Sequence, residues 1–206
     1  LVIQGFFGVF PWHVITFWFF HYLETVRGFD ATKQLITMGI AILFLAAGYP
    51  IGGMLGDYFF QRNPRGRIYV AASGVIIGAI LLWITMSIPD GNFVPFTVML
   101  CLSAIFIPFA SPNVISTVYD ITLPEVRSTA NAIQYFVEQG GSAVAPTLAG
   151  FIAVSSSMKD SILIICTAAW ILCFIFFLFV MKLLPKDLEL LRSRMHERAE
   201  LEKQLV

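Results

Sequence analysis

The sequence predicts an all-α membrane protein that crosses the bilayer six times. Its 206 residues are 58% hydrophobic and 13% charged, whereas soluble domains carry about 25% charged residues. Six apolar runs each supply the roughly 20 residues that a helix needs to cross a bilayer core. We therefore expect an integral, multi-pass protein of a plasma or inner membrane.

The six expected helices follow one another with short connectors between them. We place them at residues 1–23, 34–60, 68–88, 93–119, 128–154 and 161–184. The connectors hold most of the charges and turn formers, and residues 89–92, Pro-Asp-Gly-Asn, predict a tight turn. The expected domains are a six-helix transmembrane bundle, residues 1–185, and a tail, residues 186–206.

The tail is rich in helix formers and predicts a cytoplasmic amphipathic helix. Leu188, Leu191 and Met195 recur along it at helical spacing. A regulatory or lipid-binding switch and a plain solvated tail both remain open for this segment.

Basic residues predict the orientation of the spans. The second and fourth connectors and the tail carry most of them, whereas the odd connectors hold only Arg27, Lys33 and Lys159. Because Lys and Arg are enriched in cytoplasmic loops, both termini are expected on the cytoplasmic side. The chain opens on Leu1 inside an apolar run, without a methionine or a basic segment, which indicates a fragment rather than a signal peptide.

Several classes of function lack the residues that they need. Cys101, Cys166 and Cys173 fall within apolar runs without paired spacing, so neither a disulfide framework nor a metal site is expected. His13 and His21 share one span, and no nucleophile with a base is apparent. We therefore expect no enzyme, no cofactor, no metal and no nucleic-acid partner.

The fifth expected span carries a polar stripe that should face the bundle interior. The stripe includes Asn131, Gln134 and Glu138. Glu138 lies about 15 Å into the span, near the midplane. A carboxylate there is costly unless it is paired, protonated or hydrated. It is therefore a candidate for substrate binding or proton coupling, although a structural bond to a neighbouring helix is an equal alternative.

The first expected span presents Gln4 and Trp12 along one edge, with His13 beside them and about halfway across. Histidine titrates near neutral pH, so His13 is a candidate partner of Glu138. The alternative is a histidine whose hydrogen bonds serve packing alone.

The fourth expected span has Phe106 and Asn113 on one face, with Pro108 and Pro112 loosening its backbone hydrogen bonds. In a bilayer, such a broken helix is tolerated where it packs on protein or lines a cavity. Phe106 and Asn113 are therefore candidates for the cavity wall, with helix packing as the alternative.

Two loop patterns resemble those of one transporter family, the major facilitator superfamily. The first is Gly53-x-Leu55-Gly56-Asp57 with arginines beyond it, although Tyr58-Phe59-Phe60 stands where the family usually has a basic residue. The second runs from an acidic residue through Pro-x-x-Arg-Ser over residues 120–132. The resemblance implies a cytoplasmic gate made of Gly53, Gly56, Asp57, Arg62, Arg65, Arg67, Asp120 and Arg127.

Within this gate, Asp57 is expected to lie near the start of the fifth span, where it would meet free backbone amides. One of the arginines at 62, 65 and 67 is expected to pair with Asp120.

The resemblance also implies an architecture and a function. Members have about twelve helices in two halves, each built from two inverted three-helix repeats. This chain resembles the C-terminal half, with the N-terminal half as the alternative, and residues 4–12 are similar to the spinster-like branch. The implied function is secondary active transport of a small organic solute, symport or antiport, by alternating access and with proton coupling.

The implied partners are the solute, the lipid bilayer and the other six-helix half. A passive channel or a structural membrane subunit is the alternative function.

Overall fold

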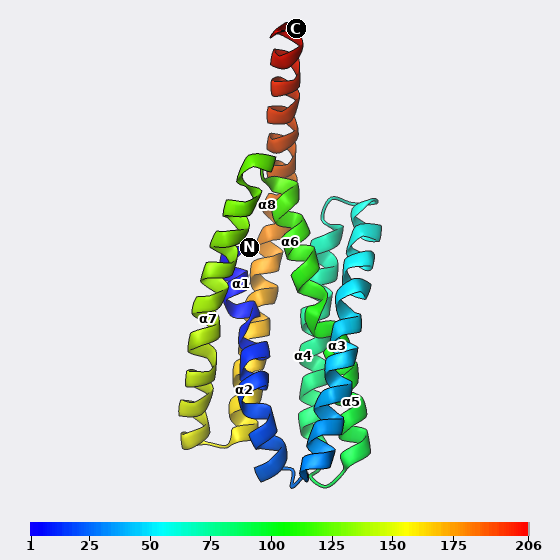
Figure 1. Cartoon of the computed structure of the whole chain (residues 1–206), viewed down its shortest axis with the longest axis vertical. Helices are drawn as coiled ribbons and strands as arrows, with labels where there is room; N and C mark the ends of the chain where they lie inside the picture. Colours follow the sequence, from blue (N-terminus) through cyan, green and yellow to red (C-terminus); the bar gives the residue numbers. More distant parts are fainter. Residues whose placement is uncertain (206) are drawn as a thin grey trace.

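The computed structural model describes residues 1–205, with side chains except those of residues 202, 204 and 205. The described chain consists of helices joined by short turns (Figure 1). The elements are α1 (Val2–Gly8), α2 (Phe10–Thr25), α3 (Ala31–Phe60), α4 (Gly66–Ser87), α5 (Phe93–Phe106), η1 (Ile107–Phe109), α6 (Ala110–Ile121), η2 (Pro124–Val126), α7 (Arg127–Ser155) and α8 (Met158–Leu205). The described residues contain no strand, and the expected all-α membrane fold is confirmed.

Five of the six expected spans are long and apolar enough to cross a membrane within the described chain. They are Val2–Thr25, Ala31–Phe60, Gly66–Ser87, Phe93–Ile121 and Met158–Leu201. The remaining span, α7, has 29 residues and therefore the length, but it is more polar. The polar stripe of α7 faces other helices of the bundle. The polar residues that make this helix less apolar are therefore the ones that can form a site.

Short turns join the helices at the end of the bundle opposite the tail. Gly28 and Gly91 adopt φ values of +64° and +87° there, which a residue with a Cβ rarely adopts. Asp30 begins α3, since its Oδ1 accepts a hydrogen bond from the Lys33 backbone N–H at 2.9 Å. That bond holds the pKa of the Asp30 carboxyl below its ordinary value.

In chain order the six spans form two repeats of three with matching features. The first span of each repeat is interrupted, between α1 and α2 and again at η1. The second span of each contains an internal proline, Pro50 or Pro146. Each interrupted span packs against the second span of the other repeat: α5 against α3, and α1 with α2 against α7. The third spans, α4 and α8, pack on each other between the two groups (Figure 1).

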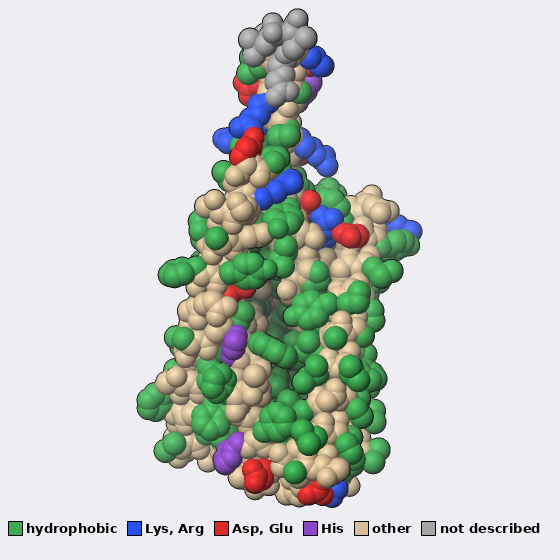
Figure 2. Space-filling model, in the orientation of Figure 1, with side chains coloured by type: hydrophobic (Ala, Val, Ile, Leu, Met, Phe, Trp, Pro, Cys, Tyr) green, Lys and Arg blue, Asp and Glu red, His purple; other side chains and the backbone are tan. Residues whose placement is uncertain are grey.

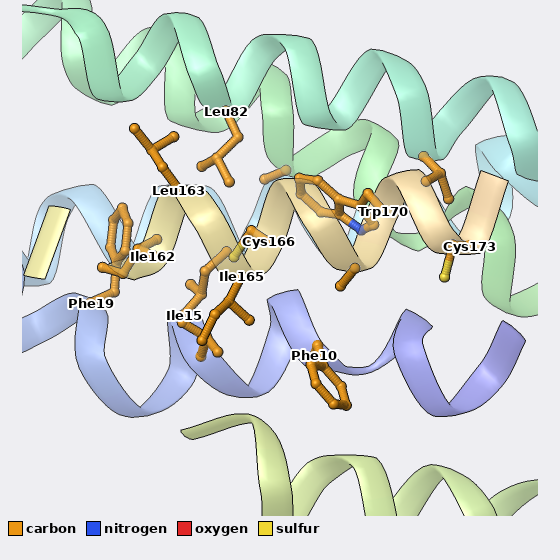
Figure 3. Packing of buried hydrophobic residues seen from close by; sticks show 14 of the residues in the cluster. Phe10, Ile15, Phe19, Leu82, Ile162, Leu163, Ile165, Cys166, Trp170 and Cys173 are labelled. Atoms are coloured by element: carbon orange, nitrogen blue, oxygen red, sulfur yellow. The ribbon is translucent and has the colours of Figure 1, made fainter. Parts of the chain in front are cut away.

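The core lies around α8, where buried side chains recur at helical spacing. Ile162, Cys166, Cys173 and Phe177 are fully buried, and Figure 3 shows side chains of α2 and α4 packed around this helix. Because lipid is as apolar as these side chains, close van der Waals packing contributes more to this contact than removal from water.

The tail continues the last span without a break. Helix α8 runs for 48 residues through Pro185 and projects beyond the rest of the bundle (Figure 1). The predicted helix after residue 185 is therefore present, but it is an extension of the span. The boundary between a bundle domain and a tail domain at residue 185 stays a prediction.

Candidate substrate and coupling site

The interruption of the first span lies directly against α7. Proline at position 11 has no N–H to donate to the Phe7 carbonyl, and the helix restarts at Phe10. A Cβ added to Gly141 would overlap the Phe6 carbonyl oxygen, and one added to Gly5 would lie 2.8 Å from Glu138 Oε1. Glycine at both positions therefore brings the backbone of α1 into contact with the polar stripe of α7.

The interruption of the fourth span faces the same space. Pro108 sits in the 3-10 turn Ile107–Phe109 and lacks the N–H that would bond to the Ala104 carbonyl. Both interruptions line one cavity of about 230 Å³. Its wall comprises Gln4, Gly5, Gly8, Val9, Trp12, Leu45, Tyr49, Ile107, Pro108, Ala110, Ser111, Val114, Ile115, Gln134, Tyr135 and Glu138.

The cavity thus draws on both interrupted spans and on both second spans, whereas α4 and α8 supply none of its lining. The visible face of the molecule is hollowed along its middle, and its charged side chains gather mainly at the two ends (Figure 2). Discontinuous helices that meet near the midplane are the usual setting of transporter binding sites.

A carboxylate and an amide form the polar part of the cavity wall. Gln134 Nε2 donates to Glu138 Oε1 at 2.8 Å, one helical turn along α7. Gln134 is 3% exposed, and its Oε1 has no partner among the described residues. Glu138 is half-buried and has no ion-pair partner in the part of the chain that the structure describes.

The expected contact between His13 and Glu138 is not formed. His13 Nε2 lies 2.6 Å from Ser142 Oγ, and that hydroxyl lies 3.0 Å from the Glu138 backbone oxygen. Residues 138 and 142 are one turn apart on α7, so the imidazole reaches the turn beyond the carboxylate. His13 also lies outside the cavity wall, and it joins α2 to α7 through Ser142.

The remaining predicted cavity residues divide between the wall and the packing. Trp12 belongs to the wall and is 40% exposed. Asn131 Nδ2 donates to Tyr119 OH at 2.7 Å and joins α7 to α6 away from the cavity. Phe106 lies outside the wall and packs with the Phe109 ring, 5.2 Å between centroids.

Asn113 likewise lies outside the wall, where it joins α6 to α3. Its Nδ2 donates to the Gly52 carbonyl at 2.9 Å and to the Phe109 carbonyl at 2.8 Å. Gly56 faces the same amide so closely that any side chain there would overlap it. The glycines of α3 therefore admit α6, and Asn113 holds the crossing.

One arginine connects three helices at the end of the bundle nearest the tail. Arg67 donates to Asp57 Oδ1 through Nε at 3.0 Å and Nη2 at 2.7 Å, and its Nη1 pairs with Asp120. Its guanidinium lies 4.1 Å from the centroid of the Phe60 ring. The expected pairing with Asp120 is thus formed by Arg67. Asp57 also binds this arginine, and among the described residues it makes no hydrogen bond to the start of α7.

The other predicted gate residues surround this ion pair. Arg62 lies over the Tyr58 ring at 4.4 Å, and Arg65 bonds through its backbone N–H to Asn63. Arg127 lies 5.6 Å from the Tyr119 ring centroid, with a buried Nε that has no partner among the described residues. A Cβ on Gly53 would lie 3.6 Å from Pro112.

Sequence reasoning placed Gln4 on the inner edge of the first span but did not select it as a site residue. Gln4 is 3% exposed and lines the cavity. Tyr49, Ser111 and Tyr135 also line it and were not selected. The sequence feature that could have indicated Gln4 is its position, since it is a polar residue in an apolar run and lies four positions before Gly8 and eight before Trp12.

Comparison with known families agrees with this geometry. A sequence model of the Major Facilitator Superfamily matches residues 1–145, more than half of the 206 residues. The match includes the whole cavity wall and all the gate residues, and it does not assign a branch such as the spinster-like one. Members of this family are membrane transporters of small molecules and are generally not enzymes. The chain therefore belongs to the Major Facilitator Superfamily.

Proposed function

We propose that this chain is one six-helix half, the C-terminal one, of a secondary active transporter that carries a small organic solute by alternating access. The observation that carries the proposal is that the interruptions of both spans line the same cavity. Family membership supports transport in general. The cavity supports the finer statement, because irregular backbone at membrane depth is tolerated where it lines a hydrated site.

Glu138 is the proposed coupling group. Its carboxylate bonds to a neutral amide and has no cationic partner among the described residues. An unpaired carboxylate inside a membrane is costly, so a bound proton or contact with water relieves it. In one conformation of the transporter the Glu138 carboxylate would be ionised and hydrated, and in the other it would be protonated. A pH gradient would therefore change the balance between the two conformations.

Arg67 with Asp57 and Asp120 is the proposed cytoplasmic gate. The three side chains tie α3, α4 and α6 together at the end from which the tail projects. Asp57 is largely exposed, so its share of the attraction is screened by water and salt. The weak ion pair between Arg67 and Asp57 therefore suits a contact that breaks in each transport cycle.

The test is uptake by proteoliposomes that contain the complete transporter, with a panel of labelled organic anions, cations and neutral molecules. At least one member should accumulate against its gradient when a pH gradient is applied. Glu138→Gln should abolish the dependence on pH, because glutamine cannot take up a proton. Glu24→Gln, the same change at an exposed position outside the cavity, should leave it intact.

Three other outcomes would contradict the proposal in different ways. Equilibration without accumulation would indicate a passive channel, and the absence of any transport would favour a structural subunit. Accumulation with an unchanged pH response in Glu138→Gln would remove the coupling role from this carboxylate.

A further inference from the structure

The cavity at the two interruptions offers negative charge without any compensating positive charge. Glu138 is the one charged residue of its wall, and no Lys, Arg or His belongs to it. An organic anion would therefore approach a carboxylate with no counter-ion in this wall. A cation would find the counter-ion that Glu138 lacks.

Two buried amide oxygens of the same wall also favour a ligand that donates hydrogen bonds. Gln4 Oε1 and Gln134 Oε1 are buried without a partner in the described chain, and each residue is 3% exposed. Buried polar groups are nearly always bonded, so two orphans in one cavity wall indicate missing donors.

The orientation of both amides follows from the other bonds that they make. Gln134 Nε2 donates to the Glu138 carboxylate, which fixes its oxygen on the opposite side. Gln4 Nε2 lies 3.6 Å from Cys173 Sγ, while the thiol donates to the Gln4 backbone oxygen at 3.3 Å. Each amide nitrogen is thus bonded within the protein, whereas each amide oxygen is buried without a donor among the described residues.

The aromatic part of the wall suits the same class of ligand. Trp12, Tyr49 and Tyr135 line the cavity and are 40%, 45% and 49% exposed. Aromatic faces attract cations through the ring quadrupole, most strongly where water is excluded. Their area also accommodates the apolar body of an organic molecule.

We propose that this cavity binds an organic cation, a protonated amine on an apolar or aromatic body, with its N–H groups directed at Glu138, Gln4 and Gln134. That such a cation is the transported solute rests on the proposed function. Binding itself rests on the cavity alone and is measured without transport.

The test compares three probes of one shape and different charge: phenethylammonium, 2-phenylethanol and phenylacetate. Their binding is measured by equilibrium dialysis against the complete transporter in lipid nanodiscs at pH 7. Phenethylammonium should bind at least about tenfold more tightly than the alcohol or the carboxylate, since hydrogen bonds to a charged group are about twice as strong as neutral ones. Glu138→Gln should reduce this preference to about twofold or less, and Glu24→Gln should preserve it.

A second variant removes one orphan oxygen and keeps the charge. Gln4→Leu should weaken phenethylammonium binding several-fold and leave 2-phenylethanol binding unchanged. The same substitution should raise the thermal stability of the ligand-free protein, because it removes a buried acceptor that has no donor. A residue that served only packing would give the opposite change in stability.

The proposal is overturned if phenethylammonium binds no better than 2-phenylethanol, if it does not bind, or if its preference survives in Glu138→Gln. Uptake of an anion or a neutral solute in the transport assay would leave the transporter proposal standing while this one fails. If all uptake is absent and the binding preference is intact, the transporter proposal fails and the proposal of cation binding stands.

Discussion

Arg27 joins the end of the first span to the turn between α4 and α5. Its Nε donates to Tyr22 OH at 2.7 Å, and its Nη1 donates to the Ile88 carbonyl at 2.7 Å. The guanidinium lies 4.2 Å from the Phe96 ring centroid and 3.4 Å from an Asp90 oxygen, and the residue is 3% exposed. A cation at the carboxyl end of α4 is also favoured by the helix dipole.

Replacement of this arginine should destabilise the bundle. Arg27→Met should lower the free energy of unfolding by about 2 to 4 kcal/mol, because it leaves a buried hydroxyl and several carbonyls without a donor. Arg27→Lys should recover only part of the loss, since an ammonium cannot reproduce the planar fork. Chemical unfolding in detergent micelles measures both, with exposed Lys33→Met as the control. Equal unfolding midpoints for Arg27→Met and Lys33→Met would contradict this role.

At the scale of elements, the crossing of α3 with α5 and α6 depends on glycine. A Cβ on Gly52 would lie 2.8 Å from the Phe109 Cα, and a Cβ on Gly48 would overlap the Ile105 carbonyl. Gly48, Gly52 and Gly56 stand four residues apart and form a small-residue face that another helix can approach closely. The partner is in this chain, because the interrupted fourth span brings its own backbone against α3.

Two glycine substitutions on α3 should have opposite effects. Gly52→Ala should destabilise the protein, because the added methyl group meets backbone that cannot move alone. Gly39→Ala should be neutral or stabilising by up to about 1 kcal/mol, since alanine favours helix and no atom lies within 4 Å of the new methyl group. Melting of both variants in the same detergent tests the difference. A melting temperature for Gly52→Ala at or above that of Gly39→Ala would be the contrary result.

The projecting part of α8 is bonded to the loop between α6 and α7. Arg198 Nη1 lies 2.7 Å from Glu125 Oε1, and both side chains are largely exposed. The backbone N–H of Glu125 and then the Arg198 guanidinium hold the pKa of the Glu125 carboxyl below its ordinary value. A lowered pKa means that the contact is complete above the ordinary carboxyl range and is lost as pH falls through the lowered value.

A spin label at Met195, which is exposed, reports this contact. Arg198→Ala should increase the mobility of the label at pH 7, and so should acidification through the lowered pKa of the Glu125 carboxyl, where this group becomes protonated. High salt should act in the same direction, because the pair is open to solvent. Arg192→Ala, also exposed, is the control. If the mobility of the label is unchanged by Arg198→Ala, by acid and by salt, the ion pair does not hold the tail.

At the scale of the whole molecule, apolar periodicity was enough to predict the six spans. The loop patterns were enough to predict that one of the arginines at 62, 65 and 67 pairs with Asp120, and the structure shows that this arginine is Arg67. His13 contacts Ser142 and not Glu138, because a helical stripe gives the face of a residue and not the turn of the neighbouring helix that it meets. Asn113 and Phe106 were candidates for the cavity wall with helix packing as the alternative, and in the structure they pack on α3 and α4. The cavity itself was not predictable, since it depends on two interruptions that meet only in the folded bundle.

The central claim is that one cavity, built at those interruptions, opens to each side of the membrane in turn. Ser111 lies on its wall and is exposed, and the three native cysteines are buried, so Ser111→Cys adds one reactive thiol. Ser155→Cys, at the exposed end of α7 opposite the tail, is the control for sidedness.

The most direct measurement is the labelling of Ser111→Cys by a membrane-impermeant maleimide added to one side or the other of oriented vesicles. The account predicts labelling from both sides, with the balance changing when the pH gradient is reversed, while Ser155→Cys reacts from the outer side alone. Labelling of Ser111→Cys from a single side, unaffected by the gradient, would contradict alternating access at this cavity.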